Sequence, residues 1–138
     1  MKRPTQEDVA RHLAWIDQIE GRTLEAKATA RRVWEQVSEL TNGEAPVPAA
    51  WAMGDSVSSD EQVIGCRWSG GEPSRNRLVL GVDIRDDGLA EWMFSGGHVE
   101  GFVTWFADQL PGEPLPPELG AHFSTLLSTA DSVPTPVS

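Results

Sequence analysis

The sequence predicts an α+β fold with a long N-terminal helix or a helical hairpin, a three- to four-stranded antiparallel β-meander and a C-terminal amphipathic helix. Three patterns predict it. Apolar residues follow a helical period over residues 5–41, alternate with polar residues over 61–95, and return to helical spacing after 117. A chain of 138 residues suits one domain, which we place at residues 1–130. Polar residues and two prolines predict a disordered tail at 131–138.

The first forty residues repeat apolar side chains every seven positions. With Val9 at position a, eight of the ten a and d positions up to Leu40 are apolar. A heptad kept over more than three or four repeats indicates a coiled coil. A single rod of this length would extend beyond so small a domain, so we expect a second copy and therefore a homodimer. The predicted self-association seam is Val9, Ile16, Ile19, Ala26, Ala30, Val33, Val37 and Leu40.

Capping signals mark both ends of this helical segment. Thr5 with Asp8 resembles a capping box at the start, and Asn42 with Gly43 supplies a left-handed stop at the end. Gly21 is the difficulty, because glycine costs about 1 kcal/mol relative to alanine inside a helix. It could instead end a first helix, with Thr23 starting a second. Since the heptad stays in phase across Gly21, we favour one helix over residues 5–41 and keep a helical hairpin as the alternative.

The β-meander is expected over residues 47–95. Short runs of alternating or β-prone residues predict an edge strand near 50–53 and strands at 61–69, 77–85 and 89–95. In the second of these, Ile64, Cys66 and Trp68 alternate onto one face. The meander therefore has one apolar face that a helix must cover.

The turn after Arg85 determines the register of the last hairpin. A two-residue loop would place Glu91 on the buried face, whereas a three-residue loop ending in Gly88 sets apolar residues opposite one another. The second register pairs Ala90, Trp92 and Phe94 with Ile84, Val82 and Leu80. It also sets Asp83 opposite Glu91, which is mildly repulsive unless an arginine lies between them.

The last third of the chain begins with an ambiguous segment. Residues 98–110 have helical apolar spacing but a β-rich composition, and we favour a helix there. Residues 111–117 are a proline-rich extended linker. Pro117 is suited to the first turn of a C-terminal helix at 117–129.

Charge limits the classes of partner. The net charge is −10, and all of it arises after residue 40, because residues 1–40 hold seven basic and seven acidic side chains. An acidic half disfavours nucleic acid and anionic membranes and favours a basic protein partner. The single cysteine and the absence of an 18-residue apolar run favour a cytoplasmic protein.

Motifs for chemistry are missing from the sequence. His12, His98 and His122 are far apart, no zinc spacing is present, and Cys66 is predicted to face inward on a strand. The glycine pairs at 70–71 and 96–97 lack a phosphate-binding context. We therefore predict no catalytic residue, metal or cofactor, and a protein that is not an enzyme.

The function that we favour is a non-enzymatic, acidic protein-binding module. Small size, acidity and absent chemistry are typical of inhibitors of basic nucleic-acid-processing proteins, such as antitoxins, immunity proteins and anti-defence proteins; that link is an analogy. The alternatives are a structural or adaptor subunit of a larger assembly, and a small-ligand binder or small enzyme. The residues predicted to bind the partner are Asp86, Asp87, Glu91, Glu100 and Trp105.

Overall fold

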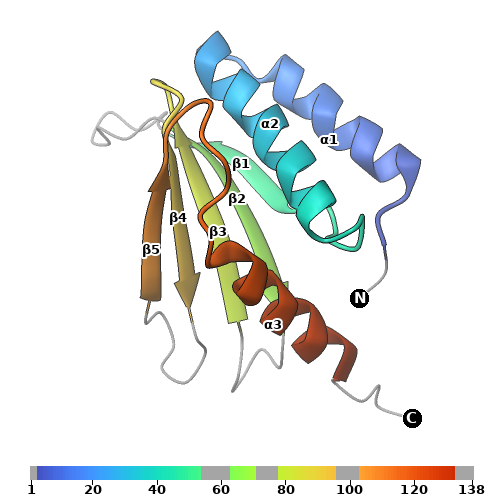
Figure 1. Cartoon of the computed structure of the whole chain (residues 1–138). Coiled ribbons are helices and arrows are strands. Elements are labelled where there is room, and N and C mark those ends of the chain that lie inside the picture. Colours follow the sequence, from blue (N-terminus) through green and yellow to red (C-terminus); the bar gives the residue numbers. More distant parts are fainter. Residues whose placement is uncertain (1–2, 54–62, 71–77, 96–102, 133–138) are drawn as a thin grey trace.

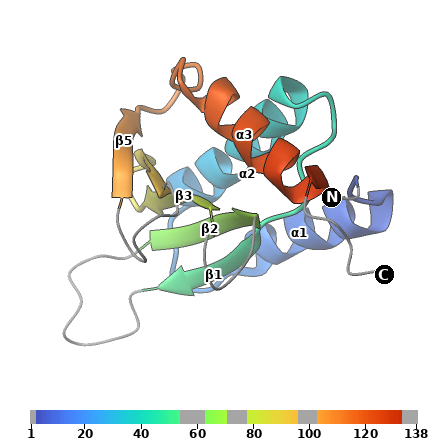
Figure 2. The ribbon, with the colours of Figure 1, turned by 90° about the horizontal axis from the view of Figure 1, so that it is seen from below.

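The computed structural model describes residues 3–53, 63–70, 78–95 and 103–132. It confirms the α+β class, with three helices and a five-stranded antiparallel sheet in the described part of the chain. The elements are α1 (Gln6–Gln18), α2 (Leu24–Leu40), β1 (Ala49–Met53), β2 (Val63–Gly70), β3 (Leu78–Arg85), β4 (Ala90–Ser95), β5 (Val103–Gln109) and α3 (Leu119–Ser132). The strands lie in the sheet in chain order (Figure 1). α2 and α3 pack on one face of this sheet, and α1 packs against α2 (Figure 2).

The N-terminal segment is a helical hairpin, so the favoured single helix was wrong. α1 ends at Gln18, and Gly21 turns the chain with a φ of 79°. That left-handed conformation is inexpensive only for glycine. Thr23 then caps α2 by accepting a hydrogen bond from the backbone N–H of Ala26 at 3.1 Å. The capping box at Thr5 and the left-handed stop at Asn42 and Gly43 are both confirmed.

Most of the predicted self-association seam lies in the core of the single chain. Six of its eight residues are no more than 7% exposed, namely Ile16, Ile19, Ala26, Ala30, Val33 and Val37. The apolar faces of the two helices are buried in the same core. Val9 is half-buried, and Leu40 is the one clearly exposed member. The homodimer therefore loses the surface on which its prediction rested.

The register of the β3–β4 hairpin matches its prediction. Gly88 has a φ of 88°, and Ile84, Val82 and Leu80 lie opposite Ala90, Trp92 and Phe94. These side chains face the helices, where Trp92 stacks on Trp68 with ring centroids 6.2 Å apart. Phe123 of α3 meets the Trp68 ring edge-on at 5.2 Å. Aromatic rings of β2, β4 and α3 therefore form the centre of the core.

β5 replaces the helix that was favoured for residues 98–110. Its pairing with β4 sets Trp105 opposite Phe94 and Ala107 opposite Trp92, so alternation decides which side chains face inward. The helical spacing was misleading because Phe106 and Leu110, which it placed on an apolar stripe, are both exposed. Residues 98–102 of that prediction lie outside the described residues.

The C-terminal helix is confirmed with shifted bounds. α3 begins at Leu119, two residues after Pro117, and buries Leu119, Phe123 and Leu126. It continues to Ser132, into the predicted tail, and residues 133–138 lie outside the described part. None of the described helices is long and apolar enough to cross a membrane.

Candidate functional site

One face of the sheet is not covered by any described helix (Figure 2). We call it the open face. It is built from the residues that alternate with the core positions along each strand, and their register follows from the pairing of the five strands. Its members include Ala49, Trp51, Gly65, Arg67, Gly81, Asp83, Arg85, Glu91, Met93, Phe106 and Asp108.

Two rows cross the open face over β3, β4 and β5. Asp83, Glu91 and Asp108 are direct cross-strand neighbours and form the acidic row. A second row lies two residues away from the acidic row on each strand. This apolar row consists of Gly81, Met93 and Phe106. Like charges placed directly opposite each other destabilise a sheet unless a cation offsets them.

Arg67 of β2 lies directly opposite Gly81, and its side chain reaches Asp83 of the acidic row. Its Nη1 donates to Oδ1 of Asp83 at 2.9 Å, and its guanidinium carbon lies 5.1 Å from the centre of the Trp51 ring. Glycines on β2 and β3 leave room for these side chains, because a Cβ at Gly81 would lie 2.7 Å from Arg67 and one at Gly65 would lie 2.9 Å from Trp51. The arginine thus offsets the repulsion at the Asp83 end of the acidic row.

Phe106 is the exposed aromatic of β5. It is 71% exposed, whereas the neighbouring Trp105 faces the helices and lies 4.6 Å from the His122 ring. The sequence pointed to Trp105 as the partner-binding residue, and the structure places Phe106 on the surface in its stead. A strand prediction for residues 103–109 would have separated Phe106 from Trp105, because successive side chains of a strand face opposite sides of the sheet.

The predicted acidic residues do not form one surface. Of them, Glu91 lies on the open face. Asp86 is engaged in the fold, since its side chain and backbone carbonyl both accept hydrogen bonds from Thr23. Asp87 forms an ion pair with Arg85 at 2.8 Å in the β3–β4 turn. Glu100 lies outside the described residues. Asp83 and Asp108 were missed, although the hairpin register already set Asp83 opposite Glu91.

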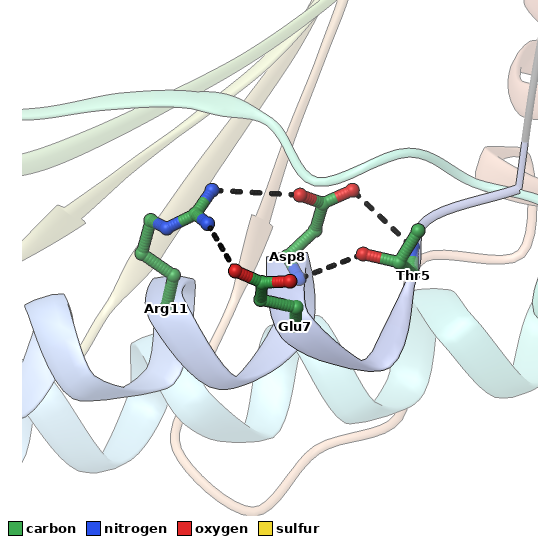
Figure 3. A network of polar contacts seen from close by, with 4 residues as sticks. All are labelled: Thr5, Glu7, Asp8 and Arg11. Carbon is green, nitrogen blue, oxygen red and sulfur yellow. Dashed lines mark hydrogen bonds and ion pairs between the residues drawn. The ribbon is translucent and has the colours of Figure 1, made fainter.

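A groove separates α1 from the segment that leads into β1. This groove has a volume of about 600 Å³ and is lined by Arg3, Pro4, Thr5, Asp8, Arg11, His12, Trp15, Pro46, Val47, Pro48 and Ala50. Along its rim, Asp8 accepts from the N–H of Thr5, and Arg11 contacts Glu7 at 3.2 Å and Asp8 at 3.5 Å (Figure 3). His12 contacts Trp15 and Trp34, and its burial lowers its pKa.

The reactive groups of the described residues offer little chemistry. Burial raises the pKa of the Cys66 thiol to about 12, so it is protonated at neutral pH and closed to solvent. Within the described ranges, no three His, Cys, Asp or Glu side chains are gathered as a metal ion would require.

Comparison of the chain with protein-family models, with curated proteins and with solved structures finds no match in any of the three. The geometry of the open face and of the groove therefore carries the functional argument.

Proposed function

We propose that the protein is a non-enzymatic module that binds a basic protein through the open face of its sheet. The observation that carries the proposal is the acidic row beside the apolar row on a face that no described helix covers. Aromatic and methionine side chains are typical anchors of protein interfaces, and here they are the exposed Phe106 and the half-buried Met93. Carboxylates beside them favour a partner that carries lysine or arginine and accelerate its association.

The charge of the whole chain supports the same partner. A net charge of −10 gives the molecule a negative field, which steers basic proteins toward it and repels nucleic acid and anionic lipid. A basic nucleic-acid-processing protein fits this field, and blocking it would make the module an inhibitor. We further propose that the module acts in the cytoplasm.

Affinity isolation from the source cells tests the proposal. The bait proteins are the wild type, a Phe106→Ser/Asp108→Asn variant, and a Leu24→Ser/Glu35→Gln control whose exposed side chains lie on α2, away from the open face. We expect the wild type and the control to retain the same basic protein, identified by mass spectrometry, and the open-face variant to lose it. Retention of the same proteins by all three baits, or retention of acidic proteins alone, would refute the proposal.

A second candidate function, the binding of a small ligand, is favoured by the groove beside α1. Its volume of about 600 Å³ is in the range of ligand pockets, and Trp15 and His12 give it an aromatic wall. Titration with 2-naphthoate, an aromatic carboxylate, tests it. We expect the indole N–H signal of Trp15 to shift in the NMR spectrum while that of Trp92, which lies in the core, stays in place. A Trp15 signal that does not move at saturating probe excludes an aromatic acid as ligand.

A further inference from the structure

The two rows of the open face run across the strands rather than along them. They span β3, β4 and β5, and neighbouring strands lie about 4.8 Å apart, so each row is roughly 10 Å long. Residues two apart in one strand are about 7 Å apart, which sets the distance between the rows. The result is a short surface with one charged and one apolar side.

This spacing matches an α-helix laid across the strands. Side chains at i, i+4 and i+7 share one face of a helix, and at 1.5 Å per residue they extend over about 10 Å. A helix is about 10 Å wide with its side chains, so its apolar stripe and one charged flank reach both rows at once. An added strand at the β5 edge would follow β5 instead and would not reach Asp83 or Gly81.

We infer that the open face binds a basic amphipathic helix of its partner, with the helix axis across β3, β4 and β5. The apolar stripe of this helix packs on Met93, on Phe106 and on the Arg67 stem that covers Gly81. Lysine or arginine on its flank faces the acidic row of Asp83, Glu91 and Asp108. This inference rests on the proposed function and specifies the structural form of the partner.

The spacing of the two rows specifies which side chains the partner helix needs. Large aliphatic side chains are needed at i, i+4 and i+7, because the Phe106 ring is 71% exposed and Gly81 has no side chain of its own. Basic side chains are needed only on the flank that faces the acidic row, because the apolar row has no carboxylate on β4 or β5.

A designed peptide provides the test. It has about 15 residues, because shorter isolated helices are marginal in water. Leucine occupies the i, i+4, i+7 and i+11 positions and lysine one flank, and a control peptide has the same composition in an order without helical periodicity. We expect the first peptide to bind the full chain at least about tenfold more tightly by calorimetry, a difference of about 1.4 kcal/mol. The amide signals of Gly81, Met93 and Phe106 should shift together in its NMR titration.

Protein variants assign the binding to the two rows. Phe106→Ser should weaken binding about tenfold as an interface anchor, while Leu24→Ser, on a leucine that is 80% exposed on α2, should leave it unchanged. Glu91→Gln/Asp108→Asn should slow association and reduce its salt dependence, whereas Glu35→Gln/Glu39→Gln on α2 should have a smaller effect.

The outcomes separate this inference from the proposed function. Equal binding of the two peptides, or signal shifts confined to β5, would overturn the helix. If the open-face variant still loses its basic partner in the affinity isolation, the proposed function stands and only the helical form falls. If that variant keeps its partner and the peptide does not distinguish Phe106→Ser from the wild type, both are refuted.

Discussion

The hydroxyl of Thr23 donates a hydrogen bond to the backbone carbonyl of Asp86 at 2.6 Å, which ties the start of α2 to the β3–β4 turn. The same hydroxyl oxygen accepts from the N–H of Ala26 and so caps the helix. Nearly two turns further along α2, Thr29 donates to the carbonyl of Gly88 at 2.9 Å. Two threonines of one helix therefore hold the turn that the hairpin register depends on.

Thr23→Ala should lower the free energy of unfolding by about 2 kcal/mol. The loss combines about 1 kcal/mol for the helix cap with about 1 kcal/mol for the hydrogen bond to Asp86. Thr5→Ala is the matched control, because Thr5 caps α1 in an exposed position and makes no bond to the sheet, and it should cost about 1 kcal/mol. Urea unfolding measures both. Equal losses in the two variants would show that the bond to Asp86 contributes nothing.

Gly21→Ala should destabilise the protein, and the sign of the change distinguishes the hairpin from a single helix. At a φ of 79°, an L-residue costs roughly 1–2 kcal/mol. In a continuous helix, the same substitution would stabilise by about 1 kcal/mol. Gly21→Asn should cost less than Gly21→Ala, since asparagine tolerates the left-handed region. Nothing lies within 4 Å of the added Cβ, so a steric clash cannot explain the loss. Thermal or urea unfolding with a gain in stability for alanine would contradict the hairpin.

The register of the β3–β4 hairpin could be predicted from the sequence because it depends on local rules. Alternation and the turn chemistry of Gly88 gave the register of β3 and β4, because side chains in a sheet repeat every two residues and a one-residue slip would bury Glu91. The capping box at Thr5 was also predictable because it is local, since Thr5 and Asp8 are three residues apart.

Decisions that depend on tertiary packing could not be made from the sequence. The heptad across Gly21 was compatible with a rod or a hairpin, and the choice depends on the packing of α2 on the sheet and of α1 against α2. Residues 103–109 satisfied a helical and a strand pattern, and pairing with β4 decides for the strand. The open face was missed as a consequence, because Phe106 and Asp108 belong to it only once β5 is part of the sheet.

Gln109→Leu should lower the free energy of unfolding by about 1–3 kcal/mol, the cost of leaving buried polar groups unpaired. The Gln109 side chain is buried and fully engaged. It accepts from Nε1 of Trp92 at 3.0 Å and donates to the side chain of Gln36 at 3.0 Å and to the carbonyl of Glu113 at 2.8 Å. Gln36→Ala removes one of these bonds at a less buried position and should cost less. Equal unfolding midpoints for wild type and Gln109→Leu would show that the network adds no stability.

His12 should make the stability of the protein depend on pH. Its ring is enclosed by Trp15, at a centroid distance of 6.2 Å, and by Trp34 at 5.8 Å, and burial lowers its pKa below the ordinary value of 6.5. The folded state therefore favours the neutral imidazole, while the unfolded chain takes up a proton near pH 6.5. The difference between the folded and unfolded pKa of His12 contributes stability that is fully lost only below the folded pKa. It is fully present above pH 6.5 and decreases as the pH falls below that value.

His12→Gln isolates this effect. The free energy of unfolding of the wild type should fall more steeply than that of the variant between about pH 7 and pH 5, because the unperturbed histidine pKa lies in that interval. The carboxylates titrate alike in both proteins and cancel in the comparison. His122, whose pKa is also lowered by burial, adds the same background to each. Parallel stability curves for the two proteins would mean that the imidazole of His12 titrates equally in the folded and unfolded chain, and that its enclosure between Trp15 and Trp34 does not exclude the charged form.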